Sequence, residues 1–426
     1  MKWRLALLLS AAIAPCTQAQ DMLIRNATVH TATAQGTLHG TDILVRNGRI
    51  AAVGKGLSSG DATVVDAQQR PVTPALFAGI TDIGVEEVSG ESATVDSHLA
   101  LNEGKSQQAR PEFDVTLAYN PDSVLVPVAR IEGLGWTLLA AEAGGGGSFV
   151  GGQGGVQRLD GSLQPIGPKA LFITLGSDGA RLTGGSRAAQ WMLLDQLVEE
   201  ARGHIAQDAP YALLTPAGRR VLKRFLQGDG RIVFTVQRAA DIVRLLDWSG
   251  RHAVRIAISG GAEAWKLASR LAAADVPVFV DPLANLPADF DQIGARADNA
   301  ARLQAAGVAV GFVQGPGSDR SQNARKIRQL AGNAVAAGMA WDDALAGLTR
   351  VPAQAFGVGG EVGGIAPGRR ADLVLWSGDP LDVAHAALQV WMDGRSMPMR
   401  SRQSELRDRY LRHASDMPHA YPATGH

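Results

Sequence analysis

Between residues 74 and 356, short apolar runs alternate with longer stretches in which apolar residues recur every three or four positions. Continuous apolar runs are typical of buried parallel strands, and the longer period is typical of amphipathic helices. Seven such units predict an α/β protein with a closed (β/α)8 TIM-type barrel. The expected strands are the runs AGITDIG, GWTLLAAEA, ALFITLG, RIVFTV, VRIAISG, VPVFVDP and VAVGFVQ.

The two ends of the chain have a different pattern, with short strands separated by tight turns. Asn47 and Gly48 lie between DILVR and RIAAVG, and this pair favours the left-handed backbone of a hairpin turn. Two β-rich ends around one barrel predict a small composite β-sandwich module built from both termini. The expected segments are a signal peptide at 1–19, the module at 20–72 plus 357–400, the barrel at 73–356, and a C-terminal helix and tail at 401–426.

The first twenty residues, MKWRLALLLSAAIAPCTQAQ, have the composition of a secretory signal. A basic start precedes a short apolar run and a site with small residues. Cleavage after Ala19 would remove Cys16, the only cysteine of the chain. A lipoprotein signal is disfavoured because proline precedes Cys16. We therefore expect a periplasmic or secreted protein without disulfides.

The charges balance, with 41 basic and 41 acidic residues. Without Lys2 and Arg4 the chain has 39 basic and 41 acidic residues, a net charge of −2. This near-neutrality argues against a nucleic-acid partner. Beyond the signal, no apolar run reaches the length of a membrane span.

The segments that flank the barrel carry a family likeness. The stretches VTPALFAGITDIG, LTRVPAQAFGV and GGIAPGRRADLVLW, in this order, resemble the amidohydrolase superfamily, most closely the imidazolonepropionase-like group. The resemblance implies hydrolysis of C–N bonds by one or two divalent metals, such as zinc, that activate a water molecule. It also implies metal ligands at the C-terminal ends of the strands: a His-x-His pair, a carboxylated lysine or a glutamate, two further histidines and an aspartate.

This sequence departs from that ligand pattern on strand after strand. Isoleucine cannot bind a metal, and a lone carboxylate such as Asp82 does not form a site. We therefore predict no metal cofactor. The residues at the implied ligand positions are Ile80 and Asp82, Phe172 to Leu175, Thr235, Ser259 or Gly260, and Gly315.

Four residues remain as catalytic candidates in a displaced site: Asp82, Glu86, His98 and Asp319. His98 and its acidic neighbours follow the first strand, at the end of a barrel where active sites lie. They would bind a cation or act as acid and base, or they are solvated charges on a loop. Of the other barrel histidines, His204 and His252 are expected on the surface.

The glycine-rich stretch EAGGGGSFVGGQGGVQRLDG follows the second expected strand. We expect a loop at the same end of the barrel, since glycine permits positive φ and leaves N–H groups open to a ligand. It either closes over a ligand through Gln153, Arg158 and Asp160, or it is a packed turn. It is not a P-loop, because no Gly-Lys-Ser/Thr follows.

Two functions follow from these observations. The first is an exported amidohydrolase-like barrel that binds a small molecule, or that is the non-catalytic partner of a metal-competent paralogue or of a second copy of itself. The alternative is a hydrolase of non-peptide C–N bonds in amides, cyclic amides or dipeptide-like compounds, with a divalent metal such as zinc. A structural subunit with a filled barrel mouth is a third hypothesis.

Overall fold

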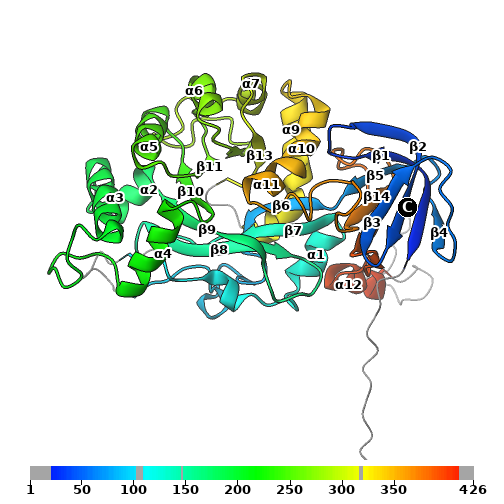
Figure 1. Cartoon of the computed structure of the whole chain (residues 1–426), viewed down its shortest axis with the longest axis horizontal. Coiled ribbons are helices and arrows are strands. Elements are labelled where there is room, and N and C mark those ends of the chain that lie inside the picture. Colours follow the sequence, from blue (N-terminus) through cyan, green and yellow to red (C-terminus); the bar gives the residue numbers. More distant parts are fainter. Residues whose placement is uncertain (1–20, 102–108, 145–146, 316–319, 412–426) are drawn as a thin grey trace, which may run out of the picture.

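The computed structural model describes residues 21–101, 109–144, 147–315 and 320–411. Their strands form two eight-stranded sheets, one in a barrel and one in a module beside it (Figure 1). No helix within these ranges combines the length and apolar character needed to cross a bilayer.

The barrel sheet has the strand order β13-β12-β11-β10-β9-β8-β7-β6. Its two edge strands approach each other, because a side chain built on Gly79 of β6 would contact the carbonyl of Phe312 in β13. The expected barrel is therefore confirmed as a nearly closed sheet. Its strands are β6 (Leu76–Thr81), β7 (Leu134–Leu139), β8 (Val150–Arg158), β9 (Ile166–Thr174), β10 (Arg231–Val236), β11 (Ile256–Gly260), β12 (Val278–Val280) and β13 (Val310–Phe312).

One barrel strand runs against the others. β8 pairs antiparallel with both β7 and β9, whereas the other neighbours in the sheet are parallel. The chain therefore passes up β7, down β8 and up β9 without a helix between them. The seven expected strands are present, and the antiparallel strand is an addition to the predicted βα pattern.

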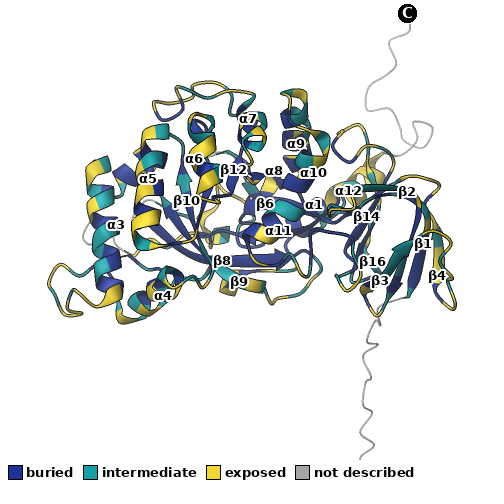
Figure 2. Cartoon of the chain, turned by 45° about the horizontal axis from the view of Figure 1, so that its top comes forward, coloured by how far each residue is buried: buried dark blue, intermediate teal, exposed yellow. Residues whose placement is uncertain are grey.

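Helices cover the outside of the barrel and separate most of its parallel strands; Figure 2 shows their exposed outer faces against the buried strands. The helices of this layer are α1 (Leu125–Arg130), α2 (Gly176–Arg181), α3 (Arg187–Arg202), α4 (Pro216–Leu226), α5 (Ala239–His252), α6 (Ala268–Ala273), α7 (Asn299–Ala305), α8 (Arg320–Asn323), α9 (Ile327–Ala336), α10 (Trp341–Gly347) and α11 (Arg350–Ala355).

The second sheet combines strands from both ends of the chain, as expected of the composite module. Asn47 and Gly48 have φ values of 50° and 76° and form the predicted hairpin turn between β2 and β3. The strands are β1 (Met22–His30), β2 (Thr37–Arg46), β3 (Arg49–Gly54), β4 (Thr63–Asp66), β5 (Pro71–Pro74), β14 (Leu373–Trp376), β15 (Ala387–Met392) and β16 (Arg395–Ser396). Helix α12 (Arg402–Tyr410) follows this sheet.

The module packs on the barrel through large apolar side chains. Trp376 of β14 is fully buried, lies against Gly133 just before β7, and donates its indole N–H to the Thr73 hydroxyl over 2.9 Å. Met392 of β15 packs against Gly135. One face of the module, with Trp376 and Met392, is thus part of the hydrophobic core of the barrel. The other face forms a separate core with residues of β1, β2 and β3.

Candidate functional site

A cavity of about 800 Å³ opens at the C-terminal ends of the barrel strands. Side chains from β6, β9, β10 and β11, and from the segments that follow β6, β7 and β13, line it. Active sites of α/β barrels lie at this end, because each strand delivers the residue that follows it to the same rim. We call this cavity the barrel mouth.

The positions at which the family resemblance implies metal ligands lie around this mouth. Ile80, Phe172, Thr235 and Gly260 all line it, so the strand-end positions were assigned to the correct end of the barrel. Their side chains offer no imidazole, carboxylate or lysine. Among the described residues, no group of three or more His, Cys, Asp or Glu side chains converges on one point that would hold a metal. The described side chains do not fit the implied metal centre.

Two of these positions are also closed by packing. Gly260 has a φ of 98°, and a Cβ placed there would come within 2.3 Å of the Gln237 amide. The side-chain amide oxygen Oε1 of Gln237 accepts a hydrogen bond from the backbone N–H of Ala262 over 3.1 Å, which fixes this side chain. A Cβ on Gly315 would lie 2.8 Å from the Asp281 carboxylate, which accepts the Gly315 N–H. Histidine or aspartate at these places would require the neighbours to move.

An arginine lies beside Asp82, which occupies one of the implied histidine positions in the mouth. Asp82 is 4% exposed and accepts a hydrogen bond from the Ser321 hydroxyl. The guanidinium of Arg320 lies 3.8 Å from the Asp82 carboxylate and forms an ion pair with Glu142. The carboxylates of Asp82 after β6 and Glu142 after β7 therefore share the positive charge of the Arg320 guanidinium.

The other catalytic candidates have different positions. Glu86 and His98 line the same cavity as Asp82. His98 is exposed and packs against Gly144, and the Ser97 hydroxyl is 3.4 Å from the Glu86 carboxylate. The structure thus brings three candidates to one cavity. Asp319 lies outside the described residues.

The remaining barrel histidines lie away from the mouth. His204 is exposed, as expected, and its ring lies 2.7 Å from Glu199. The surface prediction is wrong for His252, whose side chain is only 14% exposed, because it packs on the ring of Trp248.

The glycine-rich stretch was expected to form a loop at the mouth, and this prediction is wrong for most of its length. Residues 150–158 form the buried strand β8. A Cβ on Gly154 would lie 1.8 Å from the Leu139 carbonyl, so only glycine fits between the neighbouring strands. Gln153 lies within β8, where its N–H donates to the Phe113 carbonyl, and it is not among the residues that line the mouth.

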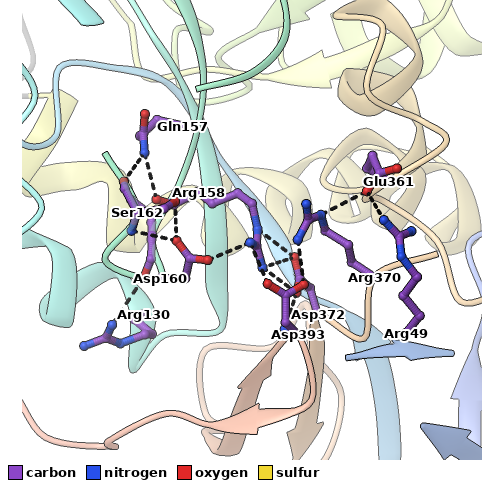
Figure 3. Close-up of polar contacts among 11 residues, drawn as sticks. Arg49, Arg130, Gln157, Arg158, Asp160, Ser162, Glu361, Arg370, Asp372 and Asp393 are labelled. Carbon is purple, nitrogen blue, oxygen red and sulfur yellow. Dashed lines mark hydrogen bonds and ion pairs between the residues drawn. The ribbon is translucent and has the colours of Figure 1, made fainter. Parts of the chain in front are cut away.

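Because β8 runs antiparallel, it carries Arg158 to the opposite end of the barrel. Figure 3 shows its guanidinium between Asp160 on one side and Asp372 and Asp393 of the module on the other. The ion-pair distances are 2.6 Å to Asp160 and 2.9 Å to each of the other two carboxylates. The position expected at the mouth is therefore wrong for Arg158 and Asp160, which join the barrel to the module.

This ion-pair cluster shifts the pKa values of its members. Burial by itself opposes charge on Arg158, but the three carboxylates raise the pKa of its guanidinium. Burial also opposes charge on Asp160, yet Arg158 and the Ser162 hydrogen bonds hold the pKa of this carboxyl below its ordinary value. Burial raises the pKa of the third member, Asp372, although Arg158 opposes this shift. The shifts of Arg158 and Asp160 favour their charged forms, which is typical of a structural ion pair.

Several polar residues of the mouth were not predicted from the sequence. Glu142 and Gln314 follow β7 and β13, and Arg320 begins α8. Asp281 follows β12 but is not among the residues that line the cavity; burial raises the pKa of its carboxyl despite three hydrogen bonds, one of them from the Gly315 N–H. The rule that strand ends meet at one rim was the signal that would have identified Glu142 and Gln314.

Comparison with known proteins finds similarity to amidohydrolases, both in sequence and in fold. The amidohydrolase family model matches residues 259–398. A solved amidohydrolase from Thermotoga maritima MSB8 superposes with a TM-score of 0.76 at 24% identity, over 89% of this chain and 100% of that one. At this identity the likeness concerns the fold.

Two sequence relatives point to the same class. The chain is 39% identical over 90 residues to an imidazolonepropionase of Acidiphilium cryptum, and 46% identical over 57 residues to the amidohydrolase tasK of Hapsidospora irregularis. These matches cover 21% and 13% of this chain, but only 22% and 6% of the two relatives. The resemblance to the amidohydrolase superfamily and its imidazolonepropionase-like group is thus confirmed.

Proposed function

We propose that this protein binds a small molecule in its barrel mouth without the metal centre that the family resemblance implies. The observation that carries the proposal is the coincidence of the cavity with the implied ligand positions. A cavity of about 800 Å³ lies within the size range of small-molecule sites. Apart from Asp82, the positions that would hold a metal carry no imidazole, carboxylate or lysine, as at Ile80 and Gly260.

The contacts around these positions favour a stable alternative arrangement. Gln237 fills the space beside Gly260, and Asp281 accepts a hydrogen bond from Gly315. Arg320 provides a positive charge to Asp82 and Glu142. A divalent cation at the same place would meet this guanidinium. The mouth therefore has a pocket with a polar wall, but its described side chains do not converge as metal ligands.

The proposed context is export, with cleavage after Ala19, and a partner that is a metal-competent paralogue or a second copy of the chain. Residues 1–19 lie outside the described part of the chain. N-terminal sequencing of protein recovered from a bacterial periplasm tests the export proposal, and an intact Met1 on cytoplasmic protein would contradict it.

Metal content and turnover of the mature protein test the proposal directly. After equilibration with Zn²⁺ and removal of the excess, elemental analysis should find no stoichiometric metal. A panel of amides, cyclic amides and dipeptides should show no turnover, with or without Zn²⁺. Stoichiometric zinc together with chelator-sensitive hydrolysis would refute the proposal.

Calorimetry with the same panel tests binding in the mouth. Ala143 lies at the rim, so Ala143→Trp should occupy part of the cavity and weaken the binding of any panel compound that binds the wild type. Ala274→Trp, at an exposed position outside the cavity, is the matched control. Equal affinity in both variants would place the binding elsewhere.

The second candidate function is hydrolysis of non-peptide C–N bonds through a displaced site. It is favoured by the three acid and base groups that share the mouth, Asp82, Glu86 and His98. The names of the two sequence relatives also describe hydrolytic proteins. If turnover appears, Asp82→Ala and His98→Ala should abolish it. Unchanged rates in both variants would exclude these residues.

A further inference from the structure

A second, much smaller pocket lies at the end of the barrel opposite to the mouth. Its volume is about 180 Å³, and it is formed by the start of β9, the turn before β10 and the end of α11. Its charged lining residues are Lys169, Asp229, Arg231 and Arg255. This volume is below the range of about 300–1,000 Å³ found for drug-sized ligands, and it suits one small group.

Arg231 and Arg255 are neighbours across two parallel strands. Ile232 of β10 is in register with Ile256 of β11, so the residues one position earlier also face each other. Adjacent strands are about 4.8 Å apart, and like charges at opposite positions are destabilising. The fold therefore places two arginines side by side at this pocket, with Arg231 half-buried and Arg255 exposed.

Neither arginine has an acidic partner within 4.0 Å among the residues that the structure describes. Arg231 donates from Nε to the Ala355 carbonyl over 2.8 Å and from Nη1 to the Ile256 carbonyl over 2.9 Å. These bonds fix the guanidinium but leave its charge unbalanced. Burial lowers the pKa of Arg231, the Arg255 charge lowers it further, and Asp275 opposes this effect.

The other two charges of the pocket are already balanced. Lys169 forms an ion pair with Asp114 over 3.0 Å, and Asp229 forms one with Arg224. The uncompensated positive charge of the lining therefore belongs to the arginine pair.

We propose that this pocket is a site for a small oxyanion, such as phosphate, held between Arg231 and Arg255. A guanidinium presents N–H groups in a planar fork that matches the oxygens of a phosphate or carboxylate. Arg231 uses two of its five N–H donors for carbonyls, which leaves donors for a ligand. An anion between the two groups would balance the charges that the strand register brings together.

Thermal unfolding and calorimetry of the mature protein with inorganic phosphate test the site. Phosphate should raise the unfolding midpoint more than chloride at equal ionic strength, with saturation. Arg255→Gln should weaken phosphate binding at least tenfold, and Arg251→Gln, at an exposed arginine near the end of α5, should leave it unchanged. Sulfate and acetate arms identify the preferred oxyanion: tighter phosphate or sulfate binding indicates a tetrahedral anion, and tighter acetate binding indicates a carboxylate.

A charge-swapped variant provides a second measurement. Arg255→Glu should pair with Arg231, raise the unfolding midpoint in chloride and remove the response to phosphate. Equal shifts with phosphate and chloride in the wild type, or undiminished phosphate binding by Arg255→Gln, would overturn the proposal. Because the pocket lies away from the mouth, these results are independent of ligand binding there.

Discussion

The two ends of the barrel use charged residues in different ways. At the module end, Arg158 is 4% exposed and is surrounded by the carboxylates of Asp160, Asp372 and Asp393. At the mouth, Arg320 is paired with Glu142 and lies 3.8 Å from Asp82, on the wall of an open cavity. Both arginines bring together carboxylates from different segments. The first arginine is almost fully buried, whereas the side chains of Arg320 and Glu142 are 18% and 38% exposed.

This difference suggests that the charged residues of the module end stabilise the fold, whereas those of the mouth are available for ligand binding. Removing one member of a buried ion pair leaves charges without partners in a low-dielectric interior, and this is costly. Ion pairs that face water contribute little, because solvent replaces the lost partner. The module end should therefore determine whether the protein folds, and the mouth should tolerate substitutions that change what it binds.

The largest expected effect is that of Arg158→Met. The substitution leaves three carboxylates without their cation and should lower the free energy of unfolding by about 3–5 kcal/mol. Guanidinium denaturation at pH 7 measures this loss. Arg407→Met is the control, because Arg407 is exposed and its acidic partner among the described residues is its neighbour Asp408; its effect should stay within about 0.5 kcal/mol. If the two variants were equally stable, the Arg158 cluster would contribute no more to stability than an exposed ion pair.

Gly260→Ala should cost about 1–3 kcal/mol, through a strained positive φ and the clash of its Cβ with the Gln237 amide. Adding Gln237→Ala should recover the part of this loss that is due to the clash. Denaturation of the two single variants and the double variant forms a double-mutant cycle. Strict additivity would show that the glutamine does not close the implied histidine position.

Asp160→Asn should lower stability by about 1–2 kcal/mol at pH 7, because Arg158 loses one charged partner. The folded-state pKa of Asp160 lies below its ordinary value of 3.8, so its charge stabilises the fold above that pH. As the pH falls through the lowered pKa, the wild type loses this advantage. Wild type and variant should therefore converge in acid denaturation below about pH 4, whereas a constant difference would contradict the ion-pair origin.

Arg320→Met should have the smallest effect on stability, about 1 kcal/mol or less. Its partner Glu142 is 38% exposed and is solvated in the variant, and Asp82 keeps the Ser321 hydroxyl. Urea denaturation checks the size of the loss. A loss as large as that of Arg158→Met would show that the two ends of the barrel are energetically alike.

The barrel and the module were predictable because their signals are local. Apolar runs, helical periodicity and the Asn47-Gly48 turn each depend on a few neighbouring residues. The contents of the mouth were partly predictable for the same reason. Once the strands were assigned, the residues after them had to meet at one rim, and Ile80, Asp82 and Gly260 lie there.

Strand β8 and its arginine were not predictable in this way. The run VGGQGGVQR is poor in the residues that favour strands. Its glycines are explained only by neighbours from other segments, such as the Leu139 carbonyl at Gly154 and the Phe113 carbonyl at Gly152. Arg158 finds Asp372 at a sequence separation of 214 residues. No local pattern distinguishes such an arginine from one that binds a ligand.

The pairing of β5 with β14 also has a consequence for biosynthesis. Pro74 is the partner of Leu373, so a strand made early in translation has no neighbour on that side until almost the whole chain has emerged. Such late, non-local contacts slow folding, and an open strand edge invites pairing with other chains. The N-terminal strands therefore require protection from aggregation while the barrel is being synthesised, and the return of β14 ends that exposure.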